Sequence, residues 1–178
     1  TIDDLNKKYG GGFVSAVSPR SYSETQNEFI GKERKRGAIR ELIRCIKGDE
    51  KAFLSVNGDI ARLKESKYLI ILDSDTRPVF DSVRNLIAVA EHPVNKPIVR
   101  NGKVVSGYGI LAPKMQTSLA SARIFFGNVM SGSTGISVYD EKSSERYQAL
   151  FGESIFCGKG LINVDVYHEL LERKLPKE

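Results

Sequence analysis

The pattern of hydrophobic and polar positions along the chain predicts several strands. Segment 68–72 (YLIIL) is a continuous apolar run, which is typical of a strand buried on both faces in a helix-covered sheet. Segment 13–18 (FVSAVS) predicts a short strand. Segment 52–63 predicts a hairpin, because its Asn57-Gly58 pair is a strong turn signal. Segment 103–114 predicts a further strand.

Apolar residues at helical spacing predict two helices in the first half of the chain. Segment 24–47 is one, with Gly48 at its end and Gly37 as a point where it divides in two. Segment 81–91 is the other, with Asp81 as its cap. The apolar stripes of the two helices are Ile39, Leu42, Ile43 and Ile46, and Val83, Leu86, Ile87 and Ala90.

The second half of the chain continues the alternation of strands and helices. A helix is expected near 117–127, followed by a Gly/Ser-rich loop, and 161–174 predicts a strand edge leading into a helix capped by Asp165. Strands that alternate with helices place the chain in the α/β class. With no internal repeat and no linker, residues 1–178 are expected to form a single domain.

Composition narrows the class of protein. The apolar fraction is 40% and the charged fraction 28%, as in soluble globular domains. No apolar run approaches the roughly 20 residues that span a bilayer. The first residues do not resemble a signal peptide. The sequence has no initiator Met, so we expect a piece of a longer protein. Cys45 and Cys157 are expected as free thiols, and His92 and His168 lack zinc-type spacing.

The formal net charge of +5 is concentrated in segment 31–47 (GKERKRGAIRELIRCIK). Such a run suits nucleic acid, an anionic membrane surface or a phosphorylated ligand. The alternative is a solvated helix face without a ligand.

Two carboxylates, Asp73 and Asp75, follow the apolar run 68–72 directly. Ligands of open α/β sheets bind beyond the carboxyl ends of strands, and alternate residues of an extended chain point the same way. Two such charges repel unless a cation lies between them, and Mg²⁺ or Mn²⁺ prefers carboxylates plus substrate phosphates. The pattern therefore predicts either a metal–diphosphate site or, equally, a polar turn closed by Pro78.

Two enzyme classes use an Asp-x-Asp pair at a strand end. In phosphatases of the haloacid dehalogenase type the first Asp accepts a phosphoryl group, and the signature continues with Thr or Val two positions after the second Asp. Here Thr76 comes one position early and Arg77 follows. In sugar transferases of the GT-A type the pair holds a metal that neutralises the diphosphate of a nucleotide sugar. The spacing favours the transferase.

Four blocks of the chain resemble the glycosyltransferase domain of cyclic β-1,2-glucan synthases, glycosyltransferase family 84. They occur in the family's order and are GKERKRGAIRELIR, LIILDSDTRP with AEHPVNKP, VVSGYGILAPKM, and YQALFGESIFCGKGLINVDVYHELL. The resemblance covers the chain from about residue 30 to its end and implies a GT-A-like mixed sheet flanked by helices, present in part. It implies an inverting, metal-dependent transfer of glucose from UDP-glucose to a growing β-1,2-glucan acceptor.

The resemblance also implies roles for individual residues. Asp73 and Asp75 would hold Mg²⁺ or Mn²⁺ on the UDP diphosphate. Tyr108 is expected either to stack on a sugar or to pack in the core. The remaining implied residues are Lys35, Arg36 and Gly37 along the nucleotide, and Glu153, Gly158, Lys159 and Gly160 on the acceptor side. Lys35 and Arg36 have a solvated helix face as their alternative, and Glu153 a capping or turn role.

The chain also departs from the family's pattern. An inverting transferase needs a general base for the acceptor hydroxyl. The resemblance implies that this base lies beyond Glu178, and that residue 1 falls just before the third strand of the sheet. We therefore expect a part of a transferase that is inactive alone. Its partners would be the parent polypeptide with its membrane helices, at the cytoplasmic face of the inner or plasma membrane, and not nucleic acid.

Two other functions stay open from the sequence. One is a non-catalytic module that binds a nucleotide sugar or another protein and keeps the sheet without the activity. The other is a phosphatase-type hydrolase with Asp73 as nucleophile, against which the position of Thr76 argues.

Overall fold

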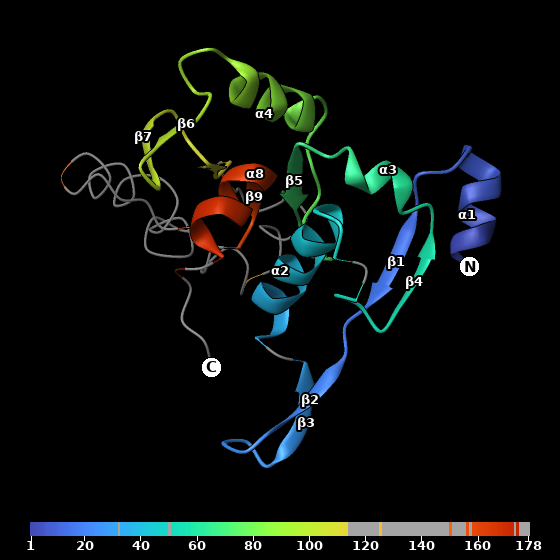
Figure 1. The fold of residues 1–178 in the computed structure, drawn as a ribbon. Coiled ribbons are helices and arrows are strands. Elements are labelled where there is room, and N and C mark those ends of the chain that lie inside the picture. Colours follow the sequence, from blue (N-terminus) through green and yellow to red (C-terminus); the bar gives the residue numbers. More distant parts are fainter. Residues whose placement is uncertain are drawn as a thin grey trace. The chain divides into compact units, whose positions relative to one another are not determined.

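The computed structural model of the chain describes residues 1–31, 33–49, 51–113, 125, 150, 156, 158–172 and 174 (Figure 1). The chain folds into two compact units, each built from separate stretches. Unit 1 comprises Thr1–Leu69, Val94–Gly109 and Ile162–Glu178, and unit 2 comprises Ile70–Pro93 and Ile110–Leu161.

Helices and strands are mixed along the described residues, which confirms the α/β class. The helical elements are α1 (Ile2–Tyr9), α2 (Arg34–Ile46), α3 (Ala61–Lys64), α4 (Ser82–Glu91), α8 (Val164–Val166) and the π-helical turn η2 (Tyr167–Leu171). The strands are β1 (Val14–Val17), β2 (Arg20–Ser23), β3 (Glu28–Gly31), β4 (Ser55–Gly58), β5 (Tyr68–Ile71), β6 (Ile98–Arg100), β7 (Lys103–Ser106), β8 (Ile110–Leu111) and β9 (Gly160–Asn163).

The strands lie in four small sheets. Three are antiparallel pairs, β1 with β4, β2 with β3, and β6 with β7. The fourth has the strand order β5-β9-β8. The predicted strand at 103–114 therefore corresponds to two shorter strands, β7 and β8, in different sheets.

The chain begins with a helix that the hydrophobic pattern did not predict. Thr1 caps α1: its hydroxyl accepts a hydrogen bond from the Asp4 amide, and the Asp4 carboxylate accepts from the Thr1 ammonium at 2.9 Å. This reciprocal arrangement satisfies N–H groups that a helix start leaves without partners. Gly10 ends the helix with φ 78°, a left-handed conformation that glycine adopts without strain.

The core of unit 1 forms where α2 packs against η2. Ile43 and Val164 are fully buried, which confirms Ile43 as part of the predicted stripe of α2. Ile46 of the same stripe is buried too, while Ile39 and Leu42 are half-buried. The other buried hydrophobic residues of the unit are Cys45, Ile162, Val166, Tyr167 and Leu170.

The predicted helix over 24–47 is wrong in its first part. It begins only at Arg34, and the residues before it form the β2–β3 hairpin, with Ser23 opposite Glu28. Asn27 takes a positive φ of 53° in the turn, which Asn tolerates better than most residues. The rings of Tyr22 and Phe29 pack edge to face across the hairpin, 5.4 Å apart. Gly37 does not divide the helix; it is buried within α2.

The predicted hairpin over 52–63 is also wrong. Segment 55–58 is a strand, β4, whose partner is β1, with Val14 opposite Gly58. The second arm is helical, because the Asp59 carboxylate accepts a hydrogen bond from the Ala61 amide at 2.9 Å and so turns the chain into α3. The chain therefore turns after Asp59, and not at the Asn57-Gly58 pair as predicted.

Two predicted helix caps differ from the observed ones. Asn163, and not Asp165, caps α8, since its side chain accepts a hydrogen bond from the Val166 amide at 3.0 Å. Asp81 does occupy the position before α4, but its side chain makes no capping hydrogen bond. Its carboxylate instead lies 3.4 Å from Nη1 of Arg84.

Unit 2 contains the apolar end of β5 and the helix α4. Its buried hydrophobic residues in the described part are Ile71, Ala90 and Leu161. Segment 81–91 is confirmed as a helix, but Val83 and Ile87 of its predicted stripe each remain 38% exposed. The predicted helix near 117–127 falls on a part of the chain outside the described residues, Phe125 excepted.

None of the helices described in the structure is long and apolar enough to cross a membrane.

Candidate functional site

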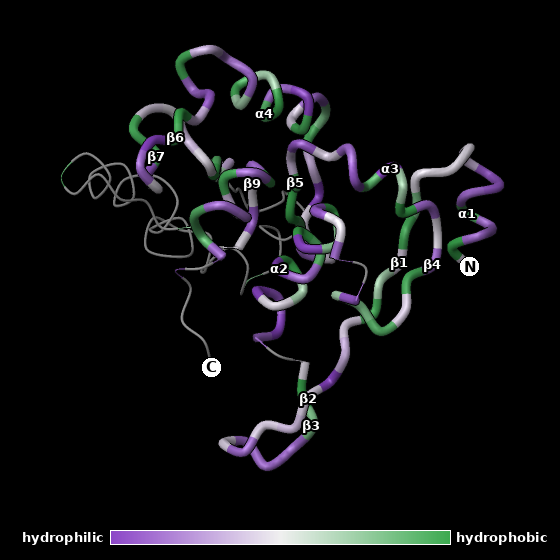
Figure 2. The backbone as a smooth tube through the Cα atoms, in the orientation of Figure 1, coloured by the Kyte–Doolittle hydropathy of each residue, from purple (hydrophilic) through white to green (hydrophobic). Residues whose placement is uncertain are grey.

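The two carboxylates predicted to hold a metal lie in a turn at the end of β5. The strand stops at Ile71, and the amide of Thr76 donates a hydrogen bond of 3.0 Å to the carbonyl of Asp73. Figure 2 shows the change from hydrophobic residues in β5 to hydrophilic residues just beyond it. A turn, one of the two alternatives predicted for this pair, is therefore present. Asp73 and Asp75 were predicted to point the same way because the backbone was taken to be extended. The strand ends at Ile71, so the backbone here is not extended.

The donor set of this turn still suits a divalent cation bound with a diphosphate. The side chain of Asp73 is 37% exposed and that of Asp75 is exposed, so a ligand from solvent can reach both. No cluster of three or more acidic, His or Cys side chains that could hold a metal exists among the described residues. Mg²⁺ is commonly held by one or two carboxylates, with phosphate oxygens and water completing its shell. Asp73 and Asp75 fit that arrangement.

A lysine from a distant part of the sequence lies against the first carboxylate. Nζ of Lys159 is 3.1 Å from Oδ2 of Asp73, within unit 2. The structure thus brings together one residue predicted on the metal side and one predicted on the acceptor side. In the described residues Asp73 already has a cationic neighbour, which offsets the repulsion between the two Asp side chains.

Glycines flank Lys159 on both sides. Gly158 and Gly160 have φ of 73° and 144°, a region that other residues rarely adopt. A Cβ atom on Gly160 would lie 2.4 Å from the carbonyl oxygen of Leu111, so only glycine allows this approach of β9 to β8. In the structure the close backbone approach at Gly160 is made to the neighbouring strand β8.

The residues predicted along the nucleotide lie at the start of α2, in unit 1. Lys35 is exposed, Arg36 is half-buried and Gly37 is buried. Nε of Arg36 donates to the carboxylate of Glu33 at 3.2 Å, so this base already has an ionic partner. These residues therefore belong to a different unit from Asp73 and Lys159.

Glu33 is a charged residue that the sequence did not single out. Its side chain is only 1% exposed and also accepts a hydrogen bond from Nη1 of Arg40 at 3.1 Å. Glu33 is the residue just before α2 and has a φ of 56°, yet its carboxylate makes no capping hydrogen bond. Removing one partner of such a buried group costs far more than an exposed ion pair is worth. The spacing Glu33-x-x-Arg36 within the basic run indicates an ion pair between the two residues, but it says nothing about the burial of Glu33.

The other predicted residues are less informative. Glu153 and Cys157 lie outside the described residues. Tyr108 is 49% exposed, so its ring is available at the surface and is not fully packed in the core. Cys45 is a free, buried thiol, as expected.

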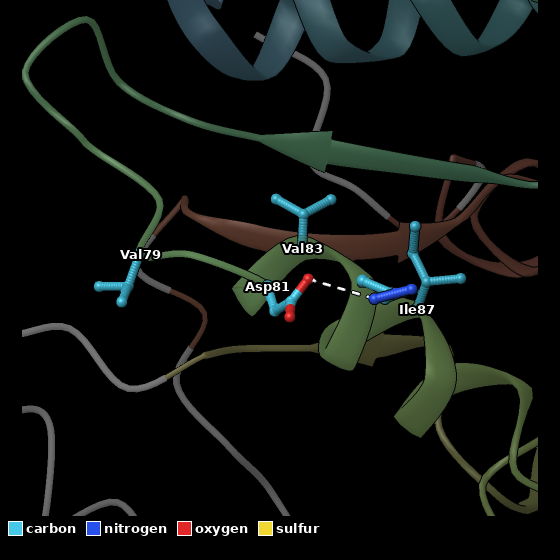
Figure 3. A pocket seen from close by; sticks show the side chains of 5 residues that line it. Val79, Asp81, Val83 and Ile87 are labelled. Atoms are coloured by element: carbon cyan, nitrogen blue, oxygen red, sulfur yellow. Dashed lines mark hydrogen bonds and ion pairs between the residues drawn. The ribbon is translucent and has the colours of Figure 1, made fainter.

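A shallow pocket of about 440 Å³ lies beyond the carboxylate turn in unit 2 (Figure 3). Its lining combines apolar side chains with the Asp81–Arg84 ion pair and consists of Val79, Asp81, Val83, Arg84 and Ile87. Val83 and Ile87 were predicted in the apolar stripe of α4, and the structure places them on the wall of this pocket.

An α/β protein with charged side chains beyond the end of a buried strand is typical of those that bind a polar ligand at that place. No protein-family model matches the chain. The chain is similar to the cyclic beta-(1,2)-glucan synthase NdvB of Rhizobium meliloti (strain 1021), with 34% identity over 160 residues, or 88% of this chain. It spans 6% of the length of that relative. The identity shows that the chain is related to a glucan synthase.

Proposed function

We propose that the chain carries part of the donor site of a glycosyltransferase that builds a β-1,2-glucan. The observation that carries this proposal is the 34% identity with a glucan synthase over 88% of the chain. In the proposed reaction, glucose passes from UDP-glucose to a hydroxyl of the growing glucan with inversion at the anomeric carbon. The four sequence blocks that resemble the family support the same assignment.

Asp73 and Asp75 are the residues we propose for the metal. Mg²⁺ or Mn²⁺ bound there would neutralise charge on the UDP leaving group. The two carboxylates would position the diphosphate beyond β5, and Lys159 would add positive charge at the same place. Lys35 and Arg36 are proposed for the nucleotide on the family resemblance alone. The acceptor side is assigned to Gly158 and Gly160 together with Glu153.

Deprotonation of the acceptor hydroxyl requires a general base. We assign this role to no residue of the chain. The chain is accordingly proposed to bind the donor and metal but to transfer no sugar by itself. The partners of the whole protein would be the glucan acceptor and the parent polypeptide at a membrane.

Binding of UDP-glucose tests the proposal. We expect calorimetric binding that requires Mn²⁺ and that Asp75→Ala weakens about tenfold to a hundredfold, because half of the carboxylate pair is lost. Asp3→Ala, a change of an exposed Asp in α1, is the matched control and should leave binding unchanged.

Two results contradict the assignment. One is binding of UDP-glucose that ignores the metal and survives Asp75→Ala. The other is transfer of a phosphoryl group to Asp73 from a small phosphate donor such as acetyl phosphate, which would support the phosphatase alternative instead.

A further inference from the structure

The contact between Lys159 and Asp73 means that the Lys159 ammonium group and a metal ion would compete for the same carboxylate. Their charged atoms are 3.1 Å apart, and the side chains are 28% and 37% exposed. The same Asp73 carboxylate is the one proposed above to hold the divalent cation. A cation that arrives at Asp73 alone therefore meets the ammonium group already beside it.

The backbone around Lys159 fixes where its side chain starts, and from there the half-buried side chain reaches Asp73. Gly160 is held against Leu111 by the close approach described above, and Gly158 shares its positive φ. Lysine carries a compact charge on a flexible four-carbon stem with three donors. The ammonium group can thus exchange one oxygen partner for another nearby without movement of β9.

Electrostatics sets when this exchange is favourable. Two cations within a few ångströms of each other repel, and the two negative charges of Asp73 and Asp75 do not balance the three positive charges of a lysine and a divalent cation. A nucleotide diphosphate brings further negative oxygens, which are good partners for both a divalent cation and a lysine. The repulsion is therefore relieved only when metal and diphosphate bind together.

We infer that Lys159 is the counter-ion of Asp73 when no donor is bound and shifts to the donor's diphosphate when metal and donor bind. Metal and donor therefore each bind well only in the presence of the other. This inference rests on the proposed function, because it takes Asp73 as a metal ligand. Lys159 is then a positioning residue that makes metal binding depend on the nucleotide. The coupling is reciprocal: the factor by which UDP raises the affinity for the metal equals the factor by which the metal raises the affinity for UDP.

Mn²⁺ binding to the full 178-residue chain tests the inference. Free Mn²⁺ is measured by electron paramagnetic resonance, with and without UDP, for the wild type, Lys159→Met and Lys159→Arg. We expect Lys159→Met to bind Mn²⁺ alone about tenfold more tightly, because the competing charge is gone. The same variant should bind UDP in saturating Mn²⁺ about tenfold more weakly. Lys159→Arg keeps the charge and should change the affinity for Mn²⁺ alone by less than about threefold.

The opposite signs of the two effects separate this role from a merely structural one. A lysine that only supports the fold, or only contacts phosphate, would not lower the affinity for Mn²⁺ in the absence of UDP. Lys159→Gln repeats the test with a polar side chain, and circular dichroism checks that each variant folds. The Lys159–Asp73 pair is half-buried, so this check is made before the binding data are compared.

The outcomes distinguish the two proposals. If Mn²⁺ and UDP bind interdependently but Lys159→Met and Lys159→Gln leave the affinity for Mn²⁺ alone unchanged or lower, the inference about Lys159 is wrong and the donor site stands. If the wild type binds UDP without any dependence on Mn²⁺, or binds neither, both proposals are overturned.

Discussion

Glu172 joins two side chains of unit 1 through its carboxylate. Nε of Arg44 donates to Oε1, and Nδ1 of His168 lies 2.8 Å from Oε2. Burial acts to raise the pKa of Glu172, but the hydrogen bonds from Arg44 and His168 outweigh it, so the pKa falls below its ordinary value of 4.5. The carboxylate therefore stabilises the folded chain in its ionised form.

Glu172→Gln is expected to lower the free energy of unfolding at neutral pH by about 1 kcal/mol, because charge-assisted hydrogen bonds to Arg44 and His168 are lost. Chemical denaturation followed by circular dichroism measures the difference. Glu169→Gln, an exposed residue of the same helical turn, is the matched control and should change stability by less than about 0.5 kcal/mol.

The same variant makes a pH-dependent prediction. A carboxyl group whose pKa is lowered on folding stabilises the protein fully above its ordinary pKa, and this contribution disappears as the pH falls through the lowered value. The gap between wild type and Glu172→Gln should thus be complete above pH 4.5 and close in more acidic solution. A gap that persists unchanged to about pH 2 would assign the effect to packing and not to charge.

The sequence identified some single residues of the candidate site and not others. Asp73 was predicted because it stands at the end of an apolar run, and such local contrast is visible in any sequence. Its contact with Lys159 was not predicted, since the pairing of distant residues depends on how strands assemble. Glu33 was not predicted for another reason. It lies among many basic residues and so resembles an exposed charged residue, and only the 1% exposure of its side chain in the structure shows that it is buried.

The dipeptide Asn-Gly occurs at two places in the described chain with opposite outcomes. Asn101 and Gly102 have φ of 52° and 69° and form the turn between β6 and β7, with Arg100 opposite Lys103. These values are those of the tight turns that favour Asn-Gly in hairpins. Asn57 and Gly58 instead lie within β4, paired with β1. The local signal is the same, so the partner strand decided the difference.

Gly58 supports a prediction about β4. Its φ of 110° excludes most side chains, and a Cβ atom there would lie 2.4 Å from the carbonyl oxygen of Phe13. We expect Gly58→Ala to lower the free energy of unfolding by about 2 kcal/mol or more, through backbone strain and this clash. Thermal and urea denaturation measure it.

Gly48→Ala is the matched control for that change. Gly48 has a similar φ of 101°, but a Cβ atom there meets nothing within 4 Å. It should therefore show the strain alone, about 1 kcal/mol. Equal losses for the two variants would show that the close approach of β1 to Gly58 contributes nothing.

The net charge of +5 belongs to the whole chain, but much of the basic run in α2 is compensated within unit 1. Arg36 and Arg40 share Glu33, and Arg44 pairs with Glu172. Lys47, just beyond the helix, pairs with Asp165. A basic surface that binds nucleic acid needs charges that are free to replace counter-ions along phosphates. The ion pairs reduce the number of such charges, so we predict that nucleic acid binds weakly.

We expect a labelled double-stranded oligonucleotide to bind the chain with a dissociation constant weaker than about 10⁻⁴ M at physiological salt. Fluorescence anisotropy at low and physiological ionic strength measures it. Asp165→Asn, which releases Lys47, should strengthen binding slightly. Micromolar binding by the wild type, with a steep dependence on salt, would reveal an uncompensated basic surface and contradict the prediction.

The sequence by itself determined the α/β class, a strand and a helix that the structure bounds at Tyr68–Ile71 and Ser82–Glu91, and the carboxylates beyond that strand. Each of these depends on hydrophobic periodicity or on residues adjacent in the chain, where the physical cause is local. Only the tertiary structure decided the pairing of β4 with β1, the burial of Glu33 and the contact of Lys159 with Asp73. Those features join residues far apart in the sequence or depend on what covers them, and a local pattern holds no information about either.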